Sequence, residues 1–205
     1  MIDAHRLDLD QALQLLQQAG ALLPDEAPHS APWLQAVLNA LCDLSSRDAL
    51  TGLVNRRSFE MALSREVDRV ARAGEPALLL MLDIDHFKAV NDGWGHEAGD
   101  RVLQGVAAVL REVLGGGVPL FRWGGEEFVV CLPGRSVHEA ARVLEGVRAG
   151  IAGHTFGEGQ RITLSVGLCA YGPERDLAAA FSRADAALRE AKDSGRDRLV
   201  AAPAA

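Results

Sequence analysis

Gly-Gly-Glu-Glu-Phe at residues 124–128 lies between two apolar runs, Val118–Trp123 before it and Phe128–Leu132 after it. Two glycines between such runs predict a tight hairpin, because glycine accepts a positive φ and lets another group approach the backbone. The adjacent acids Glu126 and Glu127 are unexpected in a hairpin that is only structural. They place negative charge on an open turn, which suits a divalent cation or a catalytic base. The alternative, for so short a motif, is an acidic surface hairpin.

The composition argues against several classes of protein. The 205 residues carry a formal net charge of −7 and are 48% hydrophobic, which is enough for a substantial core. An acidic chain without a cluster of Lys and Arg does not suit a general binder of nucleic acid or of anionic membranes. A single nucleotide bound through a metal is compatible with this charge. The longest apolar run, Ala77–Leu82, is far too short to span a bilayer.

The N-terminal sequence and the cysteines predict a cytoplasmic protein. Met1 is followed by acidic and polar residues, not by the basic and then apolar segments of a signal peptide. Cys42, Cys131 and Cys169 are scattered and form no Cys-x-x-Cys pair. An odd number of such residues fits reduced thiols in the cytosol.

Residues 1–45 are predicted to form a helical N-terminal extension, and residues 46–205 a domain. The extension has leucines at helical spacing on both sides of a proline-containing break at residues 24–32, which predicts two helices, over residues 1–23 and 33–44. Two short helices do not bury their apolar faces alone. We expect them to pack on the domain or on the same segment of a second chain. The alternative is a mere structural cap.

From residue 46 onward, helical and strand patterns alternate. The uniformly apolar run Ala77–Ile84 predicts a strand covered on both faces. Helices are predicted over residues 58–72, 97–114, 137–151 and 177–192, and strands over residues 77–84, 118–123, 128–132, 161–169 and 198–201. This order predicts an α/β (α+β) fold of the ferredoxin-like or class III cyclase palm type, in which helices flank a central sheet.

A second polar block follows the apolar strand: Asp-Ile-Asp-His-Phe-Lys at residues 83–88, which leads to Asn-Asp at residues 91–92. Ligands gather at strand ends in α/β sheets. A carboxylate there loses hydration, and a bound cation would compensate for the loss. Because Mg²⁺ uses a few carboxylates together with phosphate oxygens and water, Asp83 and Glu126 would suit it. The alternative is that Asp83 and Asp85 cap the following helix.

Three further blocks are DALTGLVNRR at residues 48–57, GHEAGD at residues 95–100 and AKDSGRD at residues 191–197. All five blocks resemble, in order and spacing, the motifs of the GGDEF family of diguanylate cyclases, here in the GGEEF spelling. The resemblance covers residues 46–200. It implies an enzyme that converts two GTP molecules into cyclic di-GMP and two pyrophosphates with Mg²⁺ or Mn²⁺. It also implies a central sheet, with antiparallel strands, akin to that of class III nucleotide cyclases.

The resemblance implies catalytic roles for the matching residues. Asp83 and Glu126 would hold the metals, with the Ile84 carbonyl as a further ligand. Glu127 lies next to that site. The proton of the attacking 3′-hydroxyl would pass to Glu126, to Glu127 or to a metal-bound hydroxide. Lys88 would act on the charge of the reacting phosphates.

The resemblance also implies how GTP is bound. Asp100 would accept hydrogen bonds from guanine N1–H and its amino group, and Asn91 would pair with the remaining polar edge, which favours GTP over ATP. The backbone N–H groups around His86 and Phe87, at a helix start, would cradle phosphates. The basic residues that would neutralise the phosphates are Lys88, Lys192 and Arg196. The residues that would leave room for the nucleotide are Gly124 and Gly125.

Simpler interpretations exist for these residues. The three basic residues would be solvated surface charges, and Asn91 would be a helix-breaking turn residue. Phe87 and Phe128 would belong to the core. His86 and His96 are not expected to bind metal, since no second histidine lies at ligand spacing and the site is rich in oxygen. Asp48 and Arg57 are interpreted as a structural link between the N-terminal segment and the domain.

One such domain holds one GTP, so turnover implies two domains facing each other in a homodimer. The competing hypothesis is a domain of this fold that has lost turnover and serves as a nucleotide receptor. Degenerate relatives lose the acids that this chain keeps. A class III adenylyl or guanylyl cyclase agrees less well with the five blocks. Many relatives inhibit themselves through an Arg-x-x-Asp motif. Because the matching positions here are Gly115 and Val118, we expect no inhibitory product site there.

Overall fold

The computed structural model describes residues 9–22, 25, 27–59, 63, 77–157, 161–171 and 176–203. Its contacts divide the chain into two compact units, one ending at Arg47 and one beginning at Asp48. In the described part of the chain, every helix is too short or too polar to pass through a lipid bilayer. The helix predicted over residues 58–72 lies mostly outside the described residues, although residues 56–59 are helical.

The N-terminal unit is a pair of helices, α1 (Asp10–Gln18) and α2 (Ala31–Ser46). α2 begins at a capping serine, because the Ser30 hydroxyl accepts a hydrogen bond from the amide of Trp33 at 3.3 Å. Among the described residues of this unit, the buried hydrophobic side chains are Leu16, Trp33 and Val37. On α2, Leu38 and Leu44 keep 55% and 40% of their surface exposed. This small core leaves apolar surface uncovered.

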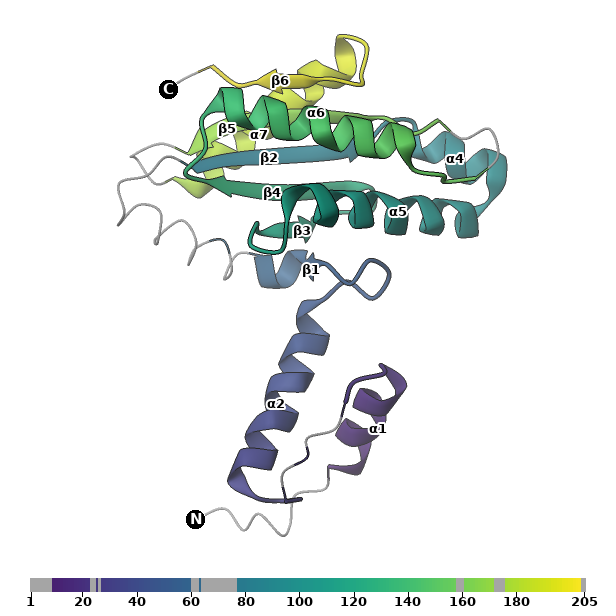
Figure 1. Ribbon diagram of the computed structural model, residues 1–205, viewed down its shortest axis with the longest axis vertical. Coiled ribbons are helices and arrows are strands. Elements are labelled where there is room, and N and C mark those ends of the chain that lie inside the picture. The colour runs from purple at the N-terminus through teal and green to yellow at the C-terminus, as the bar shows by residue number, and fades with distance from the viewer. Residues whose placement is uncertain are drawn as a thin grey trace. The chain divides into compact units, whose positions relative to one another are not determined.

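Six strands form one mixed sheet in the order β1-β3-β4-β2-β5-β6 (Figure 1). Their bounds are β1 Val54–Asn55, β2 Ala77–Ile84, β3 Leu120–Arg122, β4 Glu127–Pro133, β5 Leu164–Tyr171 and β6 Leu199–Ala201. β2 lies inside the sheet and runs antiparallel to both β4 and β5. The outer pairs β1/β3 and β5/β6 are parallel.

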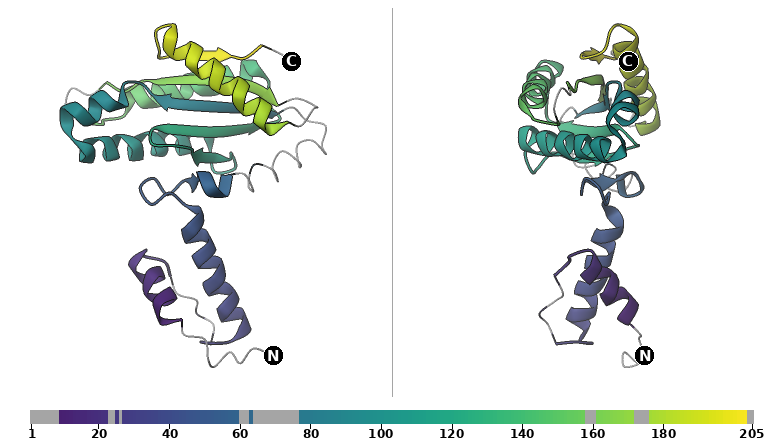
Figure 2. Two further views of the ribbon diagram at one scale, coloured as in Figure 1. Left: turned by 180° about the vertical axis from the view of Figure 1, so that it is seen from behind. Right: turned by 90° about the vertical axis from the view of Figure 1, so that its right-hand side faces the viewer.

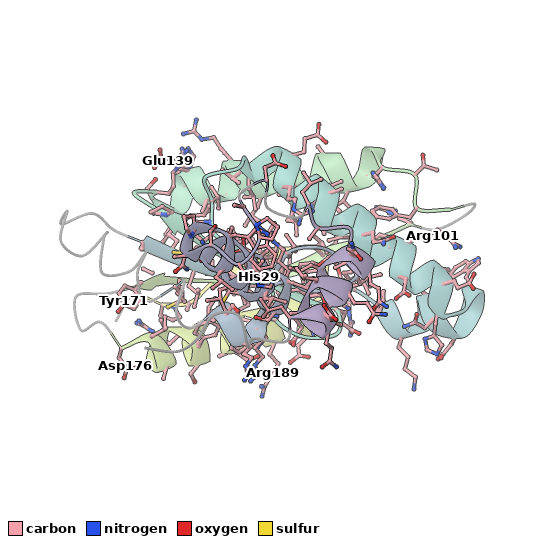
Figure 3. All side chains as sticks on the ribbon, turned by 90° about the horizontal axis from the view of Figure 1, so that it is seen from below. His29, Arg101, Glu139, Tyr171, Asp176 and Arg189 are labelled. Carbon is pink, nitrogen blue, oxygen red and sulfur yellow. The ribbon has the colours of Figure 1, made fainter. Side chains whose placement is uncertain are left out.

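Helices cover both faces of this sheet. α5 (His96–Leu114) and α6 (Val137–Gly153) lie on one face, and α7 (Leu177–Asp193) lies on the other, as the views from the two sides show (Figures 1 and 2). Figure 3 shows Glu139 of α6 and Arg189 of α7 on opposite sides of the sheet. The short helix α4 (Phe87–Trp94) follows the end of β2 almost directly.

The uniform apolar pattern of β2 is explained by this double cover. Leu78, Leu80 and Leu82 belong to the core beneath α5 and α6, whereas Leu79 and Met81 belong to the core beneath α7. Successive residues of a strand point to opposite faces, so a strand between two helical layers is apolar throughout. The predicted fold class, a sheet flanked by helices with a helical extension, is confirmed.

Several element bounds differ from the predicted ones, and α4 and β1 were not among the predicted ranges. β5 begins at Leu164 rather than at residue 161, because Leu164 is the partner of Ile84, the last residue of β2. β1 was not predicted, since its two residues are too few to show a pattern. The break after α5 lies at Gly115, as predicted, where the backbone has a φ of 79°.

Candidate active site

The end of β2 places two carboxylates in the middle of the sheet. Asp83 and Asp85 are only 4% and 6% exposed. Asp83 lies opposite Glu127 of β4 and Ser165 of β5. Side chains directly opposite each other on antiparallel strands share a face of the sheet. The β-ladder therefore brings Asp83 and Glu127 together on the face that α7 covers.

The carboxylates of Asp83, in β2, and of Asp85, directly after it, have different surroundings. Asp85 accepts hydrogen bonds from the hydroxyl of Thr163 at 2.7 Å, from the hydroxyl of Ser165 at 2.6 Å and from the amide of Asp197 at 3.0 Å. Asp83 instead pairs with Lys192, whose Nζ lies 2.8 Å from its Oδ2. Helix α4 has His86 as its N-cap and makes no side-chain cap hydrogen bond. The capping alternative for these two aspartates is therefore wrong.

The predicted hairpin joins β3 to β4 and is fastened to β2. The amide of Trp123 donates to the Glu127 carbonyl at 2.8 Å, and the amide of Ile84 donates to the Glu126 carbonyl at 3.3 Å. The second of these bonds ties the acidic turn to the end of the strand that carries Asp83.

The glycine pair acts differently from the sequence expectation. Among the described residues, neither Gly124 nor Gly125 has a positive φ. A Cβ atom on Gly124 would lie 2.6 Å from Oε2 of Glu127, whereas a Cβ atom on Gly125 would have no neighbour within 4 Å. Gly124 thus leaves room for the Glu127 carboxylate, and the space beside Gly125 is open.

Arg122 holds the carbonyl groups of the turn. Its Nε donates to the Gly124 carbonyl at 3.2 Å, and its Nη2 donates to the Gly125 carbonyl at 2.7 Å. Its Nη1 pairs with Oδ1 of Asp48 at 2.9 Å. Burial opposes ionisation of Asp48, but hydrogen bonds from Thr51 and Arg122 outweigh it and hold the pKa of Asp48 below its ordinary value. Asp48 is therefore a support for the hairpin, through Arg122.

An aromatic residue also fixes the hairpin against α7. Trp123 stacks on Phe181 of α7, with ring centroids 4.9 Å apart. The guanidinium of Arg56 also lies over the Trp123 ring, 4.3 Å from its centre. A cation near an aromatic face is attracted by the ring quadrupole. Arg56 and Phe181 thus orient the residue that precedes the glycine pair.

Basic residues approach the acids from the end of α7. Lys192 lies in its last turn, and the turn that follows has positive φ at Gly195, Arg196 and Asp197, with values of 116°, 62° and 46°. The charge of Arg196 acts on Asp83 to favour its ionised form. The structure thus brings Lys192 and Arg196 to the acidic end of β2.

The acids repel one another and lose hydration. Burial raises the pKa of Asp83 above its ordinary value, although the hydrogen bond and charge of Lys192 act in the opposite direction. Burial, and then the charge of Asp83, raise the pKa of both Glu126 and Glu127. A cation placed among these groups would relieve both effects.

The donor set fits Mg²⁺ or Mn²⁺ bound together with a nucleotide. No three acidic, histidine or cysteine side chains among the described residues form a ready-made metal cage. Mg²⁺ does not require one, since it binds through one or two carboxylates plus substrate phosphates and water. Asp83 and Glu126 supply such oxygen donors from the end of β2 and from the turn fastened to it.

The candidate base-binding residues lie where α4 meets α5. A Cβ atom on Gly99 would clash with Oδ1 of Asn91 and would lie 3.1 Å from the ring of Phe87. Gly99 therefore lets the Asn91 amide rest on α5 beside Asp100, which is exposed. Asn91 lies within α4, so its interpretation as a helix-breaking turn is wrong.

The remaining predicted residues divide into exposed and core positions. Lys88 and His86 are exposed at the start of α4, where His86 has a φ of 57°. Phe87 and Phe128 are 6% and 0% exposed and belong to the core. The first amides of a helix lack partners within it, so this helix start is suited to phosphate oxygens.

The comparisons with known proteins agree with this arrangement. A family model described as "Diguanylate cyclase, GGDEF domain" matches residues 45–198. The chain belongs to the GGDEF family of diguanylate cyclases. The diguanylate cyclase DgcP of Pseudomonas aeruginosa is 48% identical over 158 residues, which cover 76% of this chain and 24% of that protein. The chain thus spans about a quarter of the length of this GGDEF relative.

Two solved GGDEF structures resemble the chain. The GGDEF domain of DgcB from Caulobacter crescentus, in complex with c-di-GMP, has a TM-score of 0.72 at 36% identity and covers 77% of this chain and 95% of that one. A structure of the coiled coil and GGDEF domain of DgcB, also with c-di-GMP, has a TM-score of 0.78 at 30% identity. It covers 95% of this chain and 100% of that one.

Sequence reasoning about the GGDEF motifs missed Arg122 and the role of Asp85. Arg122 lies just before the glycine pair, and an arginine at that place has the fork geometry to bind two carbonyls, so a signal was present. Asp85 carries no such signal. Its partners lie 78, 80 and 112 residues away in sequence, and the motif alone does not distinguish it from Asp83.

Replacing Arg122 is expected to loosen the hairpin of this GGDEF domain. Arg122→Lys keeps the charge but not the fork, so it cannot hold the Gly124 and Gly125 carbonyls together. We expect kcat to fall roughly tenfold or more, because small misplacements of catalytic groups are costly. Steady-state rates at saturating GTP measure this. Arg135→Lys, at an exposed arginine before α6, is the control, and equal rates for both variants would contradict the role of Arg122.

Proposed function

We propose that this chain condenses two GTP molecules into cyclic di-GMP and releases two pyrophosphates. The observation that carries the proposal is the meeting of Asp83, Glu126 and Glu127 at one end of the sheet, with Lys192 paired to Asp83 at 2.8 Å. Carboxylates that can hold a metal or accept a proton, together with a lysine that can bind phosphate, suit the transfer of a nucleotidyl group. Relatives named as diguanylate cyclases, and similar domains solved with c-di-GMP, support it.

In this proposal, the 3′-hydroxyl of one GTP attacks the α-phosphorus of the other. Glu126 and Glu127 are the candidates for accepting the hydroxyl proton, and their raised pKa makes each a stronger base than an ordinary glutamate. Lys88, Lys192 and Arg196 neutralise the phosphates, which the amides at the start of α4 also bind.

Asp83 and Glu126, with the carbonyl of Ile84, would hold Mg²⁺ or Mn²⁺. The bound ion would lower the pKa of the attacking hydroxyl and stabilise charge on the phosphate oxygens. Lys192 would then exchange its place at Asp83 for the phosphates, because both are anionic partners within reach of one flexible side chain. Asp100 and Asn91, on either side of Gly99, would read guanine.

The test is incubation of the purified chain with GTP and Mg²⁺, with products identified by mass. Cyclic di-GMP and pyrophosphate in a 1:2 ratio are expected. Parallel incubation with ATP should give far less product, because a site built to bond guanine leaves polar groups unpaired with adenine. Tight GTP binding without product, in a chain that is folded and supplied with metal, would favour the nucleotide receptor instead.

We also propose that the active form is a homodimer assisted by the N-terminal unit. Each domain supplies one GTP, so the two sites must face each other. The similar DgcB structure contains a coiled coil in addition to its GGDEF domain. In this chain the exposed Leu38 and Leu44 of α2 offer apolar surface for a second copy. The alternative is that the unit only caps the chain.

Replacing both α2 leucines is expected to weaken association. The double variant Leu38→Gln, Leu44→Gln removes apolar area without charge, and we expect the dimer dissociation constant to rise at least roughly tenfold. Sedimentation velocity of the full chain over a concentration series measures it. Leu22→Gln, at a leucine that is 94% exposed and outside both helices, is the control. An unchanged dimer dissociation constant of the double variant would contradict a role of the N-terminal unit in dimerisation and would favour the alternative that it only caps the chain.

We propose no inhibitory product site at residues 115–118. Gly115 ends α5, and neither it nor Val118 offers a charged group. An arginine fork that clamps phosphate or stacks on guanine is missing at these positions.

A further inference from the structure

A pocket of about 420 Å³ lies between the end of α6 and the start of β5. Of its lining residues, Thr163 and Asp197 also take part in the site described above, where both donate to Asp85. The residues that decide its chemistry are Arg148, Ile151, His154, Arg161, Ile162 and Asp197. Its volume lies within the range of pockets that hold small organic ligands.

The pocket combines an apolar lining with positive charge. Ile151 and Ile162 are buried, at 4% and 5% exposure, and belong to the main core, so the apolar part is rigid. Arg148 and Arg161 line the same pocket. A guanidinium binds phosphate through two parallel hydrogen bonds and also stacks on flat rings. Arg148 and Arg161 thus bring two guanidinium groups to one pocket, and one of them is paired with Asp197. This chemistry selects a phosphate joined to a planar apolar group.

One wall of the pocket is fixed by close packing. The His154 ring lies against Phe156, with centroids 4.6 Å apart. A Cβ atom on Gly105 of α5 would lie 2.7 Å from Nε2 of His154 and 2.8 Å from the Phe156 ring. Gly105 therefore lets this pair sit directly on α5, which preforms the wall rather than leaving it to close on a ligand.

The pocket is linked to the candidate active site through Thr163 and Asp197, which both donate to Asp85, and Asp197 also pairs with Arg148. Arg148 Nε lies 3.1 Å from Oδ1 of Asp197. The amide of Asp197 donates to Oδ2 of Asp85 at 3.0 Å, and Arg196 immediately precedes it. Both side chains of the Arg148–Asp197 pair are partly exposed, at 44% and 33%, so the pair is weak and open to exchange. A phosphate at Arg148 would compete with the Asp197 carboxylate.

We propose that this pocket binds a nucleoside monophosphate, with its phosphate on Arg148 and Arg161 and its base on Ile151 and Ile162. Occupancy draws Arg148 away from Asp197, which loosens the turn that carries Arg196 and raises KM for GTP. The effect on KM rests on the proposed function, whereas binding does not.

The chain allows a direct test of binding, because its isoleucines are Ile2, Ile84, Ile151 and Ile162. Methyl NMR of the full chain with labelled isoleucine therefore gives two reporters in the pocket and one, Ile84, at the end of β2. On titration with GMP, we expect saturable shifts of Ile151 and Ile162. Arg161→Ala should weaken them roughly tenfold, because a charge-assisted phosphate contact is lost. Arg135→Ala, at an exposed arginine before α6, should not.

Three outcomes would overturn the site. One is a GMP titration that moves only Ile84, which would place all binding at the candidate active site. Another is equal affinity of the pocket reporters in wild type and Arg161→Ala. The third is equal affinity for inorganic phosphate and GMP, which would show that the apolar lining contributes nothing and would exclude the nucleotide.

The coupling has a separate readout in the rates. We expect GMP to compete with GTP at the proposed substrate site in wild type and variants alike, so the informative quantity is the difference in KM response between them. We expect GMP to raise KM for GTP several-fold more in wild type than in Arg161→Ala, whose basal rate should be unchanged. Arg148→Ala should raise KM without GMP, because it breaks the same ion pair. Equal responses of wild type and Arg161→Ala would overturn the coupling. A chain without turnover would refute the proposed function and leave the NMR result valid.

Discussion

Asp83→Asn is expected to abolish formation of cyclic di-GMP while the domain stays folded. Asp83 is the most enclosed of the three acids that gather at the end of β2, and asparagine keeps its shape but not its charge. The variant would lose the carboxylate proposed to hold the metal, and also the partner of Lys192. Removing a single electrostatic contributor in an enclosed site costs roughly 10²–10³ in rate. We expect at least the upper end of this range.

Stability should change little in this variant. Burial raises the pKa of Asp83, which means that the folded state disfavours its charge, so a neutral isostere removes that penalty. Lys192 is partly exposed at 31% and can be hydrated when its partner is lost. Product formation measured by mass, together with thermal melting, separates the two effects. Asp92→Asn, at an exposed position in α4, is the matched control.

A second variant tests the same site in case Asp83→Asn does not fold. Glu126→Gln lies in the turn rather than in the sheet, so it should fold even if the strand variant does not. It should also lose nearly all turnover. Near wild-type product from either folded variant would show that the acids at the end of β2 are not the catalytic centre.

Much of the fold was predictable because it follows from local pattern. The apolar run of β2 implied cover on both faces, and the glycine–acid turn between two apolar runs implied the β3–β4 hairpin. The acids were predictable as a group because charge at a strand end and on an adjacent turn is out of place in a purely structural hairpin. These inferences use residues that are near one another in sequence.

Contacts between distant segments were not predictable in the same way. Asp83 is the last residue but one of β2 and Asp85 directly follows that strand. Asp83 nevertheless faces a lysine, whereas Asp85 binds the hydroxyls of Thr163 and Ser165, at the start of β5, and an amide from the turn after α7. The contact that makes a glycine necessary at position 124 is with the Glu127 carboxylate, three residues further on, and the motif did not show it. Such differences depend on which element packs over a residue, and the hydrophobic periodicity of the sequence does not show this.

Gly167→Ala is expected to be the most destabilising of the single-methyl changes in this domain. Gly167 lies in the middle of β5, between Met81 of β2 and Val200 of β6. A Cβ atom there would clash with backbone atoms of α7, at the carbonyl of Ala184 and the amide of Leu188. Backbone atoms of a helix cannot move aside as a flexible side chain does. The whole of α7 must therefore shift away from the sheet.

Overpacking of this kind costs about 1–3 kcal/mol, and we expect the upper end, because the nearest atoms are all backbone atoms of α7. The melting temperature should fall by roughly 5–10 °C for a domain of this size. Turnover should fall as well, since α7 carries Lys192 to Asp83. Gly153→Ala is the matched control, because a Cβ atom on this last residue of α6 meets nothing within 4 Å. Its melting temperature should be unchanged or slightly higher, since alanine favours helix over glycine. If Gly167→Ala has the same melting temperature as Gly153→Ala, the close packing of α7 on β5 is contradicted. The contact of Lys192 with Asp83 would then lose its structural basis, because α7 carries Lys192.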